Sequence, residues 1–236
     1  MEMAKRQSYG LRGVSLAVQP DQIIYSNRKT LAISIDSFGR LIVRAPKRCD
    51  KTRIFNFLKE KENWISRKKA ERTGAGIDLP GENLDGYSLL LEGERYGIAL
   101  APIKKVRLDE REKRLYVPQD DARAALVKWL KAEAKRRLSL FTNAQAAEMQ
   151  TSYRSVRITS AKGRWGSCSY NDAVHYSFRL IYAPTSVIQY VVTHELAHTK
   201  HKNHSAAFWQ EVEKYCPDWR EKRAWLKKHA ILMEIF

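Results

Sequence analysis

Hydrophobic residues alternate with polar ones near the start of the chain in the manner of a β-hairpin. Residues Leu31–Ile35 and Leu41–Ala45 carry apolar side chains at every second position, and the intervening residues 36–40 are mostly polar. Two alternating runs around such a turn predict a pair of antiparallel strands. Pro46 ends the second strand, because proline has no backbone N–H to donate to a ladder.

The next segment changes to a helical period. Residues 51–70 carry apolar side chains at helical spacing among lysines and arginines: Ile54, Phe57, Leu58, Trp64 and Ile65. This spacing predicts one basic amphipathic helix that packs on the hairpin. The glycine-containing segments 73–76 and 80–81 predict a loop after it.

Short strands and one long helix are predicted in the middle of the chain. The strands are expected at residues 87–91, 96–101, 106–109 and 114–117. A helix is expected over residues 122–148, with Asp120 or Asp121 as its N-terminal cap. Its buried stripe is expected to consist of Leu126, Trp129, Leu130, Leu138 and Phe141.

The last third of the chain is predicted to contain two strands followed by three helices. The strands are expected at 155–160 and 173–178, on either side of a glycine-containing turn at 162–169. Pro184 suits the first turn of a helix over 186–199. Two further helices are expected at 205–215 and 219–230.

These elements indicate an α+β fold with two domains. We expect a β-rich N-terminal domain over residues 1–117 that contains one amphipathic helix, and a second domain over residues 118–236 that is largely helical.

Composition narrows the class of protein. Hydrophobic residues make up 44% of the 236 residues, which is typical of a folded globular chain. No apolar run approaches the roughly 20 residues that cross a bilayer, and the first six residues lead into no signal-peptide core. Cys49, Cys168 and Cys216 are too scattered for a disulfide framework. We therefore predict a cytoplasmic protein.

The chain is strongly basic. Its 43 lysines and arginines against 26 acidic residues give a formal charge of +17. Such an excess attracts nucleic acids over long distances. A solvated basic surface without a dedicated partner is the alternative, since no aromatic-interleaved nucleic-acid motif accompanies the charge.

Candidate chemistry lies in the segment His194-Glu195-Leu196-Ala197-His198. On a helix the two histidines are four residues apart and share one face, so both imidazoles can bind the same ion. Glu195 flanks them, where it can take a proton from a metal-activated water. The simpler alternative is a helix with two surface histidines. The apolar residues before the motif favour a metal, because a buried histidine pair needs polar partners.

A catalytic zinc usually has three protein ligands and one open position. His204 is favoured as the third ligand if the chain turns at residues 202–203, since Asn203 tolerates the left-handed conformation that ends helices. His201 would extend the same straight stripe, where three ligands converge poorly. A carboxylate from the next helix, Glu211 or Glu213, is the other alternative.

Other residues are candidates for supporting roles. Tyr176, Arg179 and Tyr190 are candidate oxyanion or substrate contacts, and the sequence does not choose between them. The predicted strand at 173–178 is a candidate edge strand to which an extended substrate could add. Trp165 and Cys168 are expected to pack the wall of the site.

Several motifs together resemble the YgjP-like metallopeptidase family, which is similar to the SprT-like and minigluzincin-type zinc metalloproteases. The matching segments are Trp165-Gly166-Ser167-Cys168, Arg179-Leu180-Ile181, Pro184, His194 to His198, Asn203-His204-Ser205 and Phe208-Trp209, with Arg28-Lys29-Thr30-Leu31, Ala45-Pro46-Lys47 and Trp64-Ile65 in the front half. The resemblance covers nearly the whole chain. It implies a zincin-like catalytic domain with the HExxH motif on its active-site helix, and His204 as the third zinc ligand.

The expected function is therefore zinc-dependent hydrolysis of peptide bonds, with Glu195 as the general base. Two alternatives remain open at this point. One is a nucleic-acid-associated protein in which the zincin fold serves DNA recruitment or scaffolding. The other is hydrolysis of a non-peptide amide by the same metal and glutamate. The sequence indicates neither the substrate nor the oligomeric state.

Overall fold

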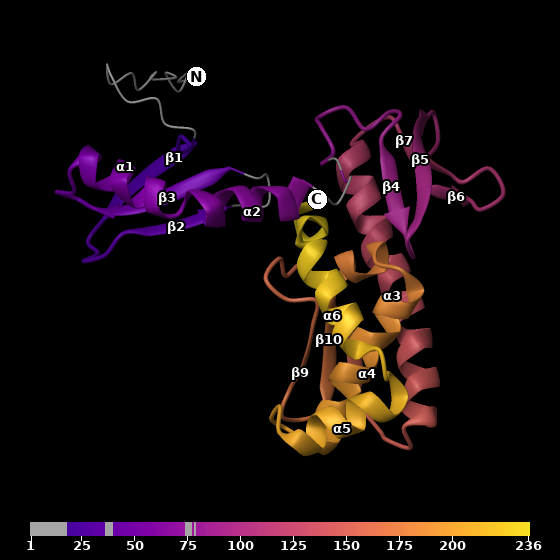
Figure 1. The fold of residues 1–236 in the computed structure, drawn as a ribbon. Helices are drawn as coiled ribbons and strands as arrows, with labels where there is room; N and C mark the ends of the chain where they lie inside the picture. Colours follow the sequence, from indigo (N-terminus) through magenta and orange to yellow (C-terminus); the bar gives the residue numbers. More distant parts are fainter. Residues whose placement is uncertain (1–17, 36–39, 74–76, 78) are drawn as a thin grey trace. The chain divides into compact units, whose positions relative to one another are not determined.

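The chain forms two compact units, which divide between residues 74 and 75 (Figure 1). The computed structural model describes residues 18–35, 40–73, 77 and 79–236. Each unit has its own cluster of buried hydrophobic side chains. Within the described residues, no helix combines the length and the apolar character needed to span a bilayer.

The first unit is built on a three-stranded sheet. Its strands are β1 (Gln22–Ser26), β2 (Ala32–Ile35) and β3 (Leu41–Pro46), in the order β1-β3-β2. Strand β3 pairs antiparallel with β2, which confirms the two strands of the predicted hairpin. Its turn at residues 36–39 lies outside the described residues. Strand β1, which the hydrophobic pattern did not predict, adds parallel to β3.

Two helices follow where the spacing predicted one. Helix α1 spans Lys51–Glu60 and helix α2 spans Glu62–Thr73. At Lys61 the backbone leaves helical geometry, with φ −100° and ψ 9°. Ile54, Leu58 and Ile65 are nonetheless buried in one cluster with the sheet, and Trp64 packs against it, as predicted. Phe57, which was also predicted for this stripe, is not part of the cluster. The break carries no glycine or proline, which is why the sequence pattern did not indicate it.

The second unit begins with a four-stranded sheet. Strands β4 (Ser88–Leu91), β5 (Glu94–Ala101), β6 (Arg107–Asp109) and β7 (Arg114–Pro118) lie in the order β4-β5-β7-β6, close to the predicted positions. Helix α3 (Ala122–Glu148) follows with the predicted bounds. Asp121 stands at its N-cap with φ 52°, but its side chain accepts no capping hydrogen bond.

This sheet belongs with the C-terminal half of the chain. Leu89, Ile98 and Leu115 of the sheet share one hydrophobic cluster with Leu126 and Leu130 of α3 and with the helices that follow. The boundary between the units therefore falls near residue 74, in the segment predicted as a loop, and not near residue 118. The change from strands to helices predicts a boundary at residue 118, whereas the shared hydrophobic cluster joins the two kinds of element.

The second unit contains a second sheet, which packs against α3 and α4. Its strands are β8 (Ser155–Thr159), β9 (Gly166–Cys168) and β10 (Ala173–Ser177), in the order β8-β10-β9. Strand β10 is paired on both sides, so it is the central strand and not the expected edge strand. Strand β9 was expected to be part of a turn. Among the described residues it forms an edge of this sheet.

The remaining helices close the second unit. A 3₁₀ turn, η1 (Phe178–Tyr182), leads into α4 (Thr185–Lys200), α5 (Ala206–Tyr215) and α6 (Trp219–Lys228), and a second turn, η2 (Ala230–Glu234), comes last. All three helices agree with the predicted segments to within two residues. Helix α4 packs against α3, β9, α5 and α6, so it is surrounded by other elements (Figure 1).

The turn between β4 and β5 holds the start of α4. The Glu92 carboxylate accepts hydrogen bonds from Arg137 of α3 at 2.7 Å and from the Thr185 hydroxyl at 3.4 Å. The Glu92 backbone N–H donates to the Ile181 carbonyl at 2.7 Å. Because Thr185 is the first residue of α4, this turn fixes the beginning of that helix.

Replacing Gly93 with alanine is expected to weaken this contact. Gly93 has φ 83°, and an added Cβ would lie 3.1 Å from the Pro184 Cα. Gly86, with φ 75° and nothing within 4 Å of an added Cβ, is the matched control for backbone strain alone. We expect Gly86→Ala to cost about 1–2 kcal/mol of unfolding free energy, and Gly93→Ala to cost roughly 1–3 kcal/mol more through overpacking. Urea unfolding measures both, and equal losses would refute the contact.

Candidate metal centre

The burial of α4 decides where its histidines point. Nine of its residues are buried, including Ile188, Val192 and Leu196, which join the main hydrophobic cluster. His194 and His198 lie one helical turn apart on a half-buried face. The spacing of the two histidines therefore places their imidazoles side by side near the C-terminal end of α4. The packing of the apolar residues fixes which way this face of the helix points.

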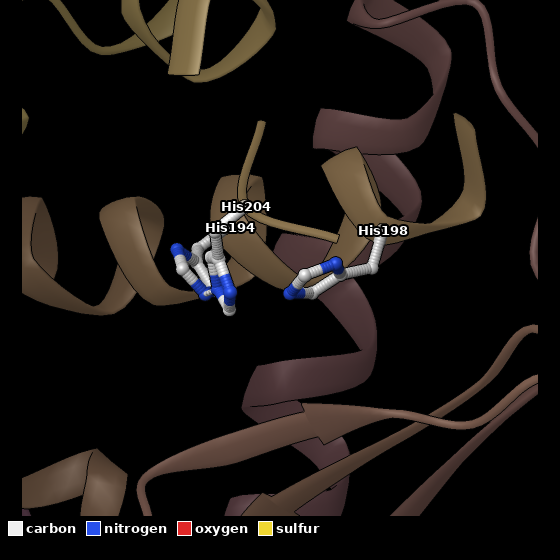
Figure 2. A group of neighbouring side chains, drawn as sticks. All are labelled: His194, His198 and His204. Carbon is white, nitrogen blue, oxygen red and sulfur yellow. Dashed lines mark hydrogen bonds between the residues drawn. The ribbon is translucent and has the colours of Figure 1, made fainter. Parts of the chain in front are cut away.

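Three imidazoles converge at this face, as Figure 2 shows. His194, His198 and His204 each offer a ring nitrogen, and these three atoms lie within 4.8 Å of one another. The Nε2 atoms of His194 and His204 are 3.2 Å apart. Among the described residues, this is the one group of three or more histidine, cysteine or acidic side chains arranged to share an ion.

His204 reaches the group because the chain turns sharply after α4. The helix ends at Lys200, and His201 takes an extended conformation with φ −128°. The Asn203 side-chain oxygen then accepts a hydrogen bond from the Ser205 N–H at 3.2 Å. The turn lies where the sequence placed it. Asn203 makes it through this side-chain hydrogen bond, however, since it is absent from the described residues with positive φ.

Aromatic rings support the three imidazoles from α5. Phe208 is fully buried, and the centre of its ring lies 4.5 Å from that of His198, 4.7 Å from that of His204 and 4.9 Å from that of His194. Trp209 stacks on His204 at 5.7 Å. Phe208 and Trp209 therefore contact the histidines directly.

The protonation of the histidines suits metal binding. The Nδ1 of His198 lies 3.0 Å from the His201 carbonyl oxygen, which can only accept, so Nδ1 carries the proton and Nε2 keeps its lone pair. Burial, with smaller contributions from His198 and His204, lowers the pKa of His194 to about 3. Burial also lowers the pKa of His198. Neutral imidazoles are the form that ligates metals.

These residues fit a divalent metal ion. The Nε2 atoms of His194 and His204 face each other at 3.2 Å, where two neutral rings either share one N–H or direct both lone pairs at a cation between them. Three imidazole donors are a common ligand set for a catalytic zinc site.

Glu195 lies beside the histidines in the same pocket. The pocket has a volume of about 420 Å³ and is lined by the three histidines, Glu195, Lys202 and residues 166–170. The Glu195 side chain is 5% exposed, and the backbone N–H of Cys168 lies near its carboxylate. Burial raises the pKa of Glu195 to about 8, while the positive charge of Arg164 and the Cys168 N–H act in the opposite direction. Such a carboxyl group accepts a proton more readily than an exposed one.

The three candidate oxyanion residues lie outside this pocket. The Tyr176 hydroxyl is buried and shares a hydrogen bond of 3.2 Å with Thr142. Arg179 donates to the Ile235 carbonyl at 2.8 Å, the Ser160 carbonyl at 3.0 Å and the Phe236 carbonyl. Tyr190 lines a different pocket, between α4, the end of α3 and residues 215–218, but the centre of its ring also lies 6.0 Å from that of His194. Tyr176 and Arg179 therefore make structural contacts, and Tyr190 packs beside a candidate ligand.

The alternative third ligands also lie outside the cluster. His201 contributes its backbone carbonyl to His198. The Glu211 carboxylate is paired with Lys200 at 2.6 Å, and the Glu213 carboxylate with Arg220 at 2.8 Å. Neither carboxylate belongs to the group of nearby donor atoms around His194.

Strand β9 forms one wall of the pocket. Gly166, Ser167 and Cys168 line it, which agrees with the expected role of Cys168. Trp165 is not among the lining residues and packs against the main hydrophobic cluster. The Cys168 thiol donates to the Ser169 carbonyl at 3.6 Å, and burial raises its pKa to about 11. A protonated thiol is a poor nucleophile and a poor metal ligand. What the sequence missed is the contribution of the Cys168 backbone N–H, since a backbone donor leaves no mark on residue type.

Comparisons with known proteins bear on the family. Part of the chain resembles the metallopeptidase zymogen of Pyrococcus abyssi abylysin, with 23% identity and a TM-score of 0.36 over 39% of this chain and 93% of that chain. It also resembles the zymogen of Methanocaldococcus jannaschii jannalysin, with 19% identity and a TM-score of 0.33 over 37% of this chain and 94% of that chain. No curated protein sequence matches the chain. The profile of the YgjP-like metallopeptidase domain matches residues 29–229. The chain therefore belongs to the YgjP-like metallopeptidase family.

Proposed function

We propose that this metallopeptidase is a zinc enzyme of the zincin type that hydrolyses peptide bonds with Glu195 as its general base. The observation that carries the proposal is the convergence of His194, His198 and His204 in one pocket with a buried carboxyl group. The family supports a peptidase, and the donor set supports zinc over harder cations, which prefer oxygen ligands.

The histidines would hold the metal through three neutral nitrogens. That number leaves a fourth position in a tetrahedral site for water or substrate. When bound, zinc lowers the pKa of water and polarises a carbonyl group. Phe208 orients all three rings by contact, so the ligand geometry is prepared before the metal arrives.

Glu195 would move the protons of the reaction. Its carboxylate takes a proton from the attacking water and delivers it to the nitrogen of the departing amine. The same group can perform both transfers because it stays in one place, buried against β9. Its burial supports this role, because burial raises the pKa of the carboxyl group from its ordinary value toward neutral pH. A general base works best when its pKa is near the pH of the reaction.

The edge of β9 is the proposed place for an extended peptide. The Ser177 N–H donates to the Trp165 carbonyl and the Ser169 N–H to the Ala173 carbonyl, each at 2.9 Å. In an antiparallel pair these bonded positions alternate with unbonded ones, so the backbone groups of Gly166 and Cys168 face away from β10. A substrate strand could pair there, beside the histidines. An edge strand next to the site favours a peptide over a small non-peptide amide.

Replacing Glu195 with glutamine tests the proposed base. The amide cannot accept the proton of water, so we expect peptide cleavage to fall by about 10²–10⁴-fold while zinc content stays at the wild-type level. Cleavage of an unstructured protein such as casein and zinc by atomic absorption measure the two quantities. Glu213→Gln, on the exposed side of α5, is the matched control and should leave both unchanged. Wild-type cleavage by the Glu195→Gln protein would rule out the mechanism.

Nucleic-acid association is a second candidate function, supported by the charge of the first unit. Its described residues carry 14 lysines and arginines against five acidic residues. Exposed members of this set include Lys47, Arg53, Lys59 and Lys61. We propose that this unit recruits the enzyme to nucleic acid. A cytoplasmic location is also proposed, since Cys49, Cys168 and Cys216 are all free thiols.

Charge reversal in the first unit tests recruitment. We expect the double variant Arg53→Glu/Lys59→Glu to weaken binding to duplex DNA by roughly tenfold or more and to flatten its dependence on salt concentration. Lys104→Glu/Lys105→Glu makes the same change of charge at exposed positions of the second unit and should have a smaller effect. Fluorescence anisotropy at several salt concentrations measures both. Equal losses of DNA affinity in the two double variants, or no DNA binding by wild type near 150 mM salt, would contradict recruitment. The positive charge would then serve only solubility.

A further inference from the structure

Gly166 of β9 lies directly against the side chain of Glu195. A Cβ added at Gly166 would fall 2.6 Å from the Glu195 Oε1, 2.8 Å from its Cγ and 3.0 Å from its Cδ. Real Cβ atoms do not approach other heavy atoms this closely. Any residue larger than glycine would therefore claim the space that the carboxyl group now fills.

Backbone conformation does not account for glycine at this position. Gly86 and Gly93 are the described glycines with positive φ, and Gly166 is not among them. An alanine could therefore adopt the backbone of residue 166 without strain. Glycine is therefore required at this position because Glu195 lies so close to it.

The packing of α4 on β9 fixes the position of the Glu195 side chain. Helix α4 packs on β9, and Gly166 and Cys168 lie on that strand with one residue between them. The Glu195 carboxylate fills the space over Gly166 and lies near the Cys168 N–H two residues further on. Gly166 thus supplies the space that the carboxyl group occupies in the pocket of the three histidines.

We propose that Gly166 is a positioning residue for Glu195. Because Gly166 has no side chain, the carboxyl group can pack directly against β9, near the Cys168 N–H. The clash created by a larger residue falls on the flexible end of Glu195 and not on backbone, so the glutamate is displaced while the strand and the three histidines stay in place. The consequence for catalysis rests on the proposed function, whereas the position of Glu195 can be measured without it.

The test compares Gly166→Ala with Gly163→Ala in the zinc-loaded, full-length protein. Gly163 lies three residues away, and an added Cβ there meets nothing within 4 Å. The first readout is the NMR resonance of the Cys168 amide, which reports the nearby Glu195 carboxylate. We expect Gly166→Ala to shift this resonance in the same direction as Glu195→Ala does, and Gly163→Ala to leave it unchanged. A wild-type Cys168 amide in Gly166→Ala would overturn the proposal.

The second readout is catalysis together with metal content. Displacing a catalytic group by about 1 Å can cost on the order of 100-fold in rate, so we expect kcat of Gly166→Ala to fall by about that factor, with KM and zinc content near wild type. Undiminished kcat would overturn the role of Gly166. If wild type itself cleaves no peptide, the proposed function fails, while the Cys168 amide still decides whether Gly166 positions Glu195.

A third variant covers the case in which Gly166→Ala does not fold. In Gly166→Ala/Glu195→Ala the side chain that would collide with the new methyl group is absent. Recovery of the folded, zinc-binding protein in the double variant would support the proposal, because the damage then passes through Glu195. Failure of the double variant to fold, with Glu195→Ala alone folding normally, would show that Gly166 serves the strand itself and would refute the proposal.

Discussion

The burial of α4 is the constraint on which the rest of the second unit depends. A helix whose apolar residues contact α3, β9, α5 and α6 cannot rotate, so the direction of each polar side chain on it is fixed by packing. His194 and His198 then face the chain as it returns through His204, and Glu195 faces β9. The hydrophobic core thereby assembles most of the candidate metal centre, and Phe208 completes it by touching all three imidazoles.

Much of this arrangement could be predicted because it is encoded locally. The strands of the second unit's first sheet, helix α3 and the turn after α4 follow from periodicity and from short-range residue preferences. The predictions that were wrong concern features that depend on contacts between distant segments. The residues around 118 change from strand to helix, yet Leu115 and Leu126 share a core, so no unit boundary falls there. Strand β10 alternates like an edge strand but gains a second partner in β9, whose sequence resembles a turn.

The candidate site also has a part that local sequence predicts and a part that it does not. The spacing of the histidines and the glutamate is a property of one helix and the turn after it, and this local information is enough to favour His204 over His201. Residue type and proximity in sequence make Arg179 a candidate oxyanion residue, but its guanidinium donates to the carbonyls of Ile235 and Phe236. The space at Gly166 and the N–H of Cys168 were invisible to such reasoning, since they arise where β9 meets α4.

The central claim is that His194, His198 and His204 together form a zinc site. The most direct measurement is the zinc content and zinc affinity of His204→Ala beside His201→Ala, two changes of the same kind three residues apart. Loss of a ligand should weaken zinc binding severely in His204→Ala, while His201→Ala should bind zinc as wild type does, because only its backbone carbonyl contacts the site. Retention of zinc by His204→Ala with its loss from His201→Ala would contradict the account.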